Sequence, residues 1–186
     1  MDPKLKDDYD WEKEYPQYHA WQTIDMEKNG TTFQLPLDTK VKDGIIMEEG
    51  LHPNHRLLYE FMLKQQPASV LEVGCGYCNH LLSISRILPD TELYGCDISQ
   101  RQLMGAQRKY GAEVMAFSLM WGDFTEVNID FQVDIVYSQA VLMHMSTERA
   151  RLALEKMCKV ATKYVVSIDG GLIIPDLEDF LGTLGT

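Results

Sequence analysis

The chain lacks the features that mark membrane-spanning, secreted and nucleic-acid-binding proteins. None of its apolar runs approaches the ~20 residues that a membrane-spanning helix needs, and its first ten residues, MDPKLKDDYD, contain no apolar stretch of the signal-peptide kind. Only 17 basic residues stand against 28 acidic ones, and the net charge of −11 disfavours a partner held by phosphate neutralisation. We therefore expect a cytoplasmic protein with no membrane and no nucleic-acid partner.

Cysteine is also scarce. Four cysteines in a chain without a secretory signal are expected to be reduced thiols rather than a disulfide framework: Cys75, Cys78, Cys96 and Cys158. The Cys75-Gly-Tyr-Cys78 segment has the spacing of a redox or zinc motif, but no second Cys or His pair completes a tetrahedral site. We expect no bound metal.

The remaining composition is that of an ordinary globular domain. A chain of 186 residues with 45% hydrophobic and 24% charged residues is long enough to bury roughly 70% of its unfolded surface in one core. The acidic excess lies mainly at the two ends, residues 1–30 and 169–186, so the middle of the chain is nearly neutral. This distribution suits a small or uncharged substrate.

The pattern of apolar residues divides the chain into two parts. Residues 1–50 are rich in aromatics but have no sustained period, which predicts an irregular, partly helical N-terminal arm. Residues 51–186 form the expected main domain, in which short apolar runs alternate with helical segments. Strands are expected at 69–73, 92–97, within 113–121, 133–138 and 164–168. This alternation predicts an α/β fold, with a doubly wound, mostly parallel sheet and helices on both faces.

Capping residues and apolar stripes predict the helices between these strands. A helix near 55–66 ends at Pro67 and carries the stripe Leu57, Leu58, Phe61 and Met62. Another covers 80–88. Ser99 and Ser146 are expected to cap two more, the first stopping at Gly111 and the second packing through Leu152, Ala153, Lys156 and Met157.

Polar and glycine residues follow four of the expected strands, where an open parallel sheet binds its ligands. The segments are Gly74-Cys75-Gly76, Asp97, Gly122-Asp123-Phe124 and Ser138-Gln139-Ala140 with His144 nearby. A carboxylate at Asp97 suits the hydroxyls of an adenosine ribose, and Asp123 beside Phe124 suits an adenine. Each segment also has a simple structural interpretation as a turn, a cap or a half-buried histidine. Their joint occurrence favours a ligand site.

These segments carry a family resemblance over residues 52–169. VLEVGCGYCNH, YGCDIS, WGDF and VDIVYSQAVLMHM resemble the motif series of the class I, Rossmann-like S-adenosylmethionine-dependent methyltransferases. The resemblance implies that S-adenosylmethionine is the cofactor. It assigns the methionine part to Glu72, Gly74 and Gly76 with Cys75, the ribose to Asp97 with Ile98, the adenine to Asp123 and Phe124, and the space beneath the sulfonium to Ser138, Gln139 and Ala140.

The resemblance also bears on the methyl acceptor. His144 matches a histidine that many members have after the fourth strand; it is either the proton acceptor of the reaction or a residue that orients a loop. Among the N-terminal aromatics, Tyr15, Tyr18 and Trp21 form either a lid and acceptor wall or a cover for the sheet edge.

A nicotinamide-binding fold is the main rival. Its glycine loop reads GxGxxG so that a helix N-terminus meets a pyrophosphate, whereas this chain has Asn79 at the third glycine position. S-adenosylmethionine has no phosphate, so the departure favours the methyltransferase.

Two departures from the family pattern qualify the expectation. Only eighteen residues follow Ile168, too few for the usual last helix and antiparallel hairpin, so we expect the sheet edge to be covered by the tail, by the N-terminal arm or by a homodimer partner. The Asn-Pro-Pro-aromatic run of nucleic-acid amino-methyltransferases is replaced by SQAV. We expect a small-molecule O or N acceptor; a protein or peptide methyltransferase and a catalytically silent cofactor-binding subunit are the alternatives.

Overall fold

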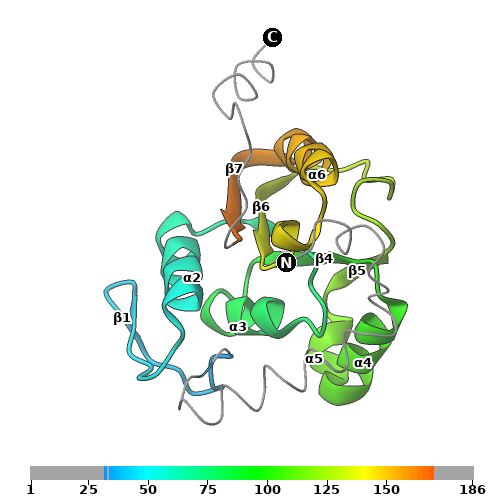
Figure 1. The fold of residues 1–186 in the computed structure, drawn as a ribbon. Helices are drawn as coiled ribbons and strands as arrows, with labels where there is room; N and C mark the ends of the chain where they lie inside the picture. Colours follow the sequence, from blue (N-terminus) through cyan, green and yellow to red (C-terminus); the bar gives the residue numbers. More distant parts are fainter. Residues whose placement is uncertain (1–31, 33, 170–186) are drawn as a thin grey trace.

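A five-stranded parallel sheet forms the centre of the molecule, in a computed structural model that describes Thr32 and residues 34–169. The strand order is β5-β4-β3-β6-β7, and the strands are β3 (Ser69–Val73), β4 (Glu92–Asp97), β5 (Ser118–Trp121), β6 (Val133–Gln139) and β7 (Ala161–Ile168). All four neighbouring pairs are parallel. The chain builds outward from β3 to β5 and then returns to the other side of β3 (Figure 1). The order of the strands therefore reverses between β3 and β6, and the predicted doubly wound α/β fold is confirmed.

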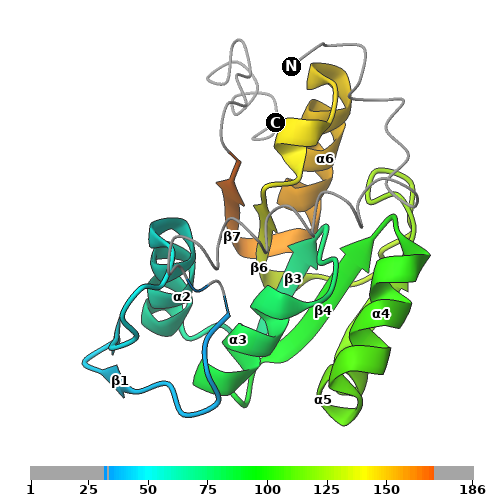
Figure 2. The same cartoon turned by 60° about the horizontal axis from the view of Figure 1, so that its bottom comes forward.

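Helices cover both faces of this sheet (Figures 1 and 2). On one face, the side chains of Val70, Ile135 and Tyr137 belong to a core shared with residues of three helices, α2 (Pro53–Gln65), α3 (Asn79–Ile87) and α4 (Gln100–Tyr110). On the other face, Leu71 and Val136 pack with α6 (Thr147–Val160). The alternation of side chains along each strand divides the apolar core into these two layers.

The caps form where the sequence predicts them. Ser99 Oγ accepts a hydrogen bond from the backbone amide of Gln102 at 3.3 Å, and Ser146 Oγ accepts one from Arg149 at 3.4 Å. Gly111 ends α4 with a φ of 53°, a left-handed conformation that glycine adopts without a side-chain clash. The predicted strands at 69–73 and 92–97 match β3 and β4 residue for residue.

Two predicted helix faces are wrong in one residue each. Helix α2 buries His55, Leu58, Tyr59 and Met62, whereas Leu57 is 66% exposed. The buried positions follow the i, i+3, i+4, i+7 spacing of one helical stripe, and two of them carry polar groups that an apolar pattern does not select. On α6, Leu152 is likewise turned outward, at 42% exposure.

The segment 113–121 divides between two elements. Its first part belongs to the short helix α5 (Ala112–Met115), and only the last four residues form β5. A small antiparallel hairpin, β1 (Val41–Lys42) with β2 (Ile45–Ile46), lies in the stretch predicted to be irregular, and Asp43 and Gly44 turn it with positive φ. Tyr15, Tyr18 and Trp21 lie outside the described residues. None of the described helices combines the length and the apolar character of a membrane span.

Candidate functional site

The glycine loop after β3 is built against two neighbouring segments. The backbone amides of Gly74 and Cys75 donate to the carbonyl oxygen of Cys96 at 2.7 and 3.2 Å, which fixes the loop beside the end of β4. Gly74 has a φ of +73°, and a Cβ there would lie 2.3 Å from Cγ2 of Val141. Glycine is therefore required both by the backbone conformation and by the close approach of the loop after β6.

Asp97 joins the glycine loop to the start of α4. Its buried carboxylate accepts a hydrogen bond from the Gly76 amide at 2.7 Å and one from the Ser99 amide at 2.8 Å. Each carboxylate oxygen accepts one of these bonds. The side chain thus holds the glycine loop against the start of α4.

Glu72 is a buried carboxyl group directly preceding the loop. It pairs in register with Gly95 on one side and Tyr137 on the other. Its Oε2 atom is buried without a hydrogen-bond partner, and burial raises the pKa of this carboxyl group well above its usual value. A buried acceptor without a partner is costly unless a ligand or water completes it.

Asp123 and Phe124, the two residues predicted to bind adenine after β5, both contact other residues of the protein. Asp123 Oδ1 accepts from the amide and hydroxyl of Thr125 at 2.8 and 2.7 Å, and its Oδ2 pairs with Arg149. Phe124 is buried, with Lys156 Nζ 5.3 Å from its ring centroid. A role for Asp123 and Phe124 in adenine binding stays a prediction.

Two exposed apolar side chains lie at the ends of β4 and β5. Ile98 is 49% exposed and Trp121 is 60% exposed. The indole Nε1 of Trp121 donates to the carbonyl oxygen of Ile98 at 3.0 Å, which ties the two residues together. Trp121 was not among the predicted site residues. The signal that could have identified it is an aromatic residue at the end of an expected strand, directly before Gly122. Together Ile98 and Trp121 present exposed apolar side chains directly after Asp97 and at the end of β5.

The loop after β6 is organised by Asp169, which follows β7. Its Oδ1 accepts from the backbone amides of Val141 at 2.5 Å and Met143 at 3.4 Å. Its Oδ2 accepts from the hydroxyls of Ser138 and Ser167, each at 2.8 Å. Asp169 was not predicted as a site residue, because hydrogen bonds to backbone amides leave no sequence pattern.

This loop carries the remaining predicted residues. Ser138 and Gln139 end β6, and Ala140 has the unusual φ of 54° for a residue with a side chain. His144 closes the single turn η2 (Leu142–His144), half-buried, with its backbone amide donating to Val141 O at 3.0 Å. Among Thr32 and residues 34–169, no group of three or more His, Cys, Asp or Glu side chains could hold a metal ion.

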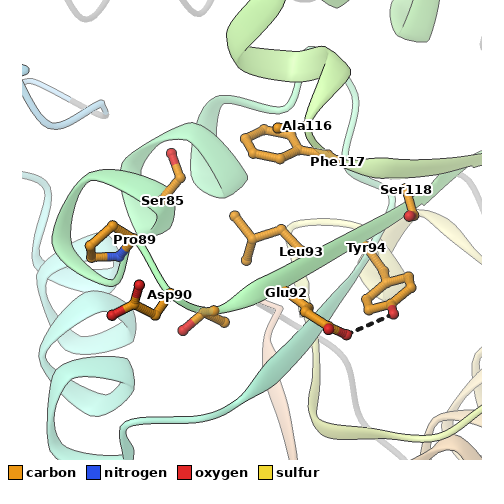
Figure 3. A pocket seen from close by; sticks show the side chains of 10 residues that line it. Ser85, Pro89, Asp90, Glu92, Leu93, Tyr94, Ala116, Phe117 and Ser118 are labelled. Atoms are coloured by element: carbon orange, nitrogen blue, oxygen red, sulfur yellow. Dashed lines mark hydrogen bonds between the residues drawn. The ribbon is translucent and has the colours of Figure 1, made fainter.

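A separate cavity of about 510 Å³ lies at the opposite, amino-terminal edge of the sheet (Figure 3). It is lined by residues of the α3–β4 connection and the start of β5, among them Asp90, Leu93 and Phe117. On its rim, Tyr94 Oη donates to Glu92 Oε2 at 3.1 Å. None of the predicted site residues lines this cavity, so the candidate site is the carboxyl edge.

The fold and this edge together define a class of protein. A parallel sheet whose strand order reverses beside a glycine loop and a strand-end carboxylate is the architecture of Rossmann-like cofactor-binding enzymes. Residues 70–163 match the family model described as a methyltransferase domain. The chain belongs to this family, and the predicted class of S-adenosylmethionine-dependent methyltransferases is confirmed.

Solved structures of methyltransferases are similar to this chain, and one with a TM-score above 0.5 shows the same fold. A protein of Nostoc punctiforme PCC 73102 assigned as an O-methyltransferase is 17% identical, with a TM-score of 0.54 over 69% of this chain and 41% of that one. Magnesium protoporphyrin IX methyltransferase from Synechocystis PCC 6803, with S-adenosylmethionine bound, is 23% identical, with a TM-score of 0.49 over 62% of this chain and 58% of that one. The chain thus spans less than two thirds of the length of each of these proteins. No curated protein matches it.

Proposed function

We propose that the chain transfers a methyl group from S-adenosylmethionine to a hydroxyl or amino group of a small molecule. The observation that carries this proposal is the Asp97 carboxylate, which bridges the amides of Gly76 and Ser99 at the carboxyl edge of the sheet. This bridge sets the glycine loop and a further hydrogen-bond acceptor side by side, as an adenosine-containing cofactor requires.

The residues at this edge fit the cofactor. Asp97 would accept hydrogen bonds from the ribose hydroxyls, and the exposed faces of Ile98 and Trp121 would contact the adenine. The unpartnered Oε2 of Glu72 lies beneath the loop that would hold the methionine part. Cys75 also belongs to this loop; its thiol points at Gly95, where a Cβ would lie 2.7 Å from Sγ.

The chain's own task is to position two reactants. When bound, the sulfonium cofactor supplies a methyl group that is already activated, so most of the acceleration comes from orientation. The loop of Ser138, Gln139 and Ala140, fixed by Asp169, would form the floor of the reaction site. His144 at the end of this loop stays a candidate for taking up the proton of the acceptor.

Two other functions are the alternatives. A protein or peptide acceptor is favoured by the acidic ends of the chain if that acceptor is basic. A silent cofactor-binding subunit would bind the cofactor without turnover. The small-molecule proposal is supported by the nearly neutral middle of the chain, and residues 1–50 are proposed as its lid.

Calorimetric titration with S-adenosylmethionine tests the proposal. We expect micromolar binding, roughly −8 kcal/mol, which Asp97→Ala weakens at least tenfold because both the ribose contacts and the loop support are lost. The matched control is Asp134→Asn, since Asp134 also accepts a backbone amide, from Ala68 at 2.8 Å, but at the amino edge of the sheet. Equal affinities for the Asp97 variant and the unaltered chain would refute the ribose assignment.

A second measurement separates the three functions. Turnover of methyl-labelled S-adenosylmethionine with small phenols and amines supports the proposed one. Label transferred to a basic peptide instead supports the protein methyltransferase, and tight binding with no transfer to either supports the silent subunit.

A further inference from the structure

The side chain of Gln139 carries an oxygen that no other group in the described part of the chain satisfies. Gln139 is the last residue of β6 and is half-buried. Its Oε1 atom is buried and, among Thr32 and residues 34–169, has no hydrogen-bond partner. A buried carbonyl oxygen in this state is costly, and the cost is removed when a ligand or water donates to it. The atom is therefore a candidate contact for a ligand that carries an N–H or O–H group.

The strand pairing places Gln139 at the glycine loop. Ser138 pairs in register with Val73, so Gln139 lies level with Gly74, the first residue of the loop. On its other side, Gln139 pairs with Ile168, the last residue of β7. The order of the strands reverses between β3 and β6, and an open parallel sheet binds its ligands at that point. Gln139 thus belongs to the candidate site itself.

The direction of the Gln139 side chain follows from its neighbours in the sheet. In-register partners share one face, and so do side chains two residues apart along a strand. Ile168 and Tyr137 both pack in the core on the side of α2 and α3, so Gln139 faces that side. Glu72, whose Oε2 also lacks a partner, pairs with Tyr137 on the same face. Gln139 therefore lies one step nearer to the carboxyl edge than the carboxyl group proposed for the methionine part of the cofactor.

Hydrogen bonds hold the backbone on both sides of Gln139. Asp169 accepts from the hydroxyl of Ser138 at 2.8 Å and from the amide of Val141 at 2.5 Å. The amide of Ala140 donates to the carbonyl oxygen of Ile168 at 3.1 Å. A side chain on a backbone fixed in this way can hold a reactant in one orientation, which is the main requirement for methyl transfer.

The chemistry of the carboxamide favours one kind of methyl acceptor. Its oxygen accepts hydrogen bonds, but the neutral group does not take up a proton at pH 7. A hydroxyl group must lose its proton to become a good nucleophile, whereas a neutral amine already has a free lone pair. A residue that accepts a hydrogen bond without removing a proton therefore suits an amine. This requirement does not depend on the role of His144.

We propose that the Gln139 carboxamide binds a neutral amine as the methyl acceptor, with Oε1 accepting a hydrogen bond from the amine N–H. This inference rests on the proposed function and deepens it, because it narrows the acceptor from a hydroxyl or amino group to an amino group. During transfer the nitrogen lone pair forms the new bond to the methyl carbon, and the electron pair of the broken sulfur–carbon bond stays on sulfur. The product is a methylated ammonium ion, which releases a proton to water.

Aniline and phenol test the proposal, because they have the same shape and both are neutral at pH 7. With methyl-labelled S-adenosylmethionine, we expect transfer to aniline to be at least about tenfold faster than transfer to phenol. Gln139→Met removes the accepting oxygen at a similar side-chain volume. It should lower kcat/KM for aniline at least about tenfold and lower the affinity for S-adenosylhomocysteine, the demethylated product, by much less. Gln139→Glu keeps an accepting oxygen and should recover part of the aniline turnover.

Gln132→Met is the matched control. Gln132 directly precedes β6, at the opposite end of the strand, where its Nε2 donates to the carbonyl oxygen of Lys159 at 3.1 Å. This variant also replaces a hydrogen-bonding glutamine by methionine, but away from the candidate site. It should leave both the aniline turnover and the S-adenosylhomocysteine affinity unchanged.

A binding measurement separates the two proposals. Protein labelled with nitrogen-15 at glutamine is saturated with S-adenosylhomocysteine and titrated with aniline. The side-chain amide signals of Gln139, identified by their absence in Gln139→Met, should move more than those of any other glutamine. Failure of S-adenosylhomocysteine to bind would contradict the proposed function itself. If that compound binds normally, unmoved Gln139 signals, transfer to phenol as fast as to aniline, no transfer to aniline, or an unchanged kcat/KM in Gln139→Met would overturn the role of Gln139 alone.

Discussion

Glu72 shows how a single buried residue beside the candidate site can cost stability. It lies on a central strand, in register with Gly95 and Tyr137, and its Oε2 has no hydrogen-bond partner. Burial raises its pKa, so the folded protein holds a proton that the unfolded chain releases once the pH exceeds the ordinary value near 4.5. Stability contributed at this position therefore decreases as the pH rises above that value.

Glu72→Gln should remove this pH dependence. Glutamine has a similar shape but does not ionise, so the variant should gain stability over the unaltered chain as the pH rises from 5 to 8, by at most about 1.4 kcal/mol per pH unit. Urea denaturation at several pH values measures the difference, with the exposed Glu92→Gln as control. The same variant should bind S-adenosylmethionine more weakly if Oε2 contacts the cofactor. A stability difference that is constant with pH would show that Glu72 ionises freely in the folded state.

At the residue scale, the sequence predicted strand-end residues better than it predicted what they contact. Asp97 was selected because carboxylates at that position suit a ribose, and it does lie beside the glycine loop. The Tyr59–His80 contact joins two helices 21 residues apart in sequence, and no local spacing encodes such a pair. Trp121 and Asp169 were missed for a similar reason: their partners are backbone groups of other segments.

At the scale of elements, the conformation of the loop after β6 depends on Asp169, which directly follows the neighbouring strand β7. Asp169 satisfies two backbone amides and two hydroxyls there, so the conformation of residues 138–143 is fixed from outside the loop. The left-handed Ala140 within it is a conformation that surrounding bonds must maintain.

Asp169→Asn should loosen this loop. An amide has one acceptor oxygen and one donor nitrogen, so at least one of the bonds is lost, at a cost of about 1–3 kcal/mol. Hydrogen–deuterium exchange should rise at the amides of Val141 and Met143, and S-adenosylmethionine should bind more weakly. The control Asp130→Asn changes an exposed aspartate. Unaltered exchange at those two amides would contradict the assignment of Asp169.

Element boundaries were predictable where side-chain chemistry marks them. Ser99, Gly111 and Ser146 define helix ends through their own hydrogen bonds or backbone freedom, and those ends match. The run 113–121 is apolar throughout, so it has no internal signal for the change from α5 to β5. There the tertiary pairing of Met120 with Cys96 decides where the strand lies.

At the scale of the whole molecule, the feature that bears on assembly is the edge of the sheet at β7. The two edge strands of the sheet are β5 and β7, and within the described part of the chain nothing pairs with the outer side of β7. Several β7 side chains are exposed, including Tyr164 at 43%, where its ring meets Phe61 edge to face. An edge of eight residues with unpaired amides and carbonyls is a template for another strand.

We expect the protein to form a homodimer through this edge. A two-fold axis would place β7 of each copy against the other, so that one contact covers the β7 edges of both copies at once. Light scattering should then give a mass near twice 21.3 kDa, and β7 amides should exchange more slowly at higher protein concentration. The matched comparison is the β5 edge, whose exchange should not depend on concentration. A monomer at every concentration up to about 100 μM, well above a typical stable-dimer dissociation constant, would contradict the dimer and leave coverage by the chain's own segments as the explanation.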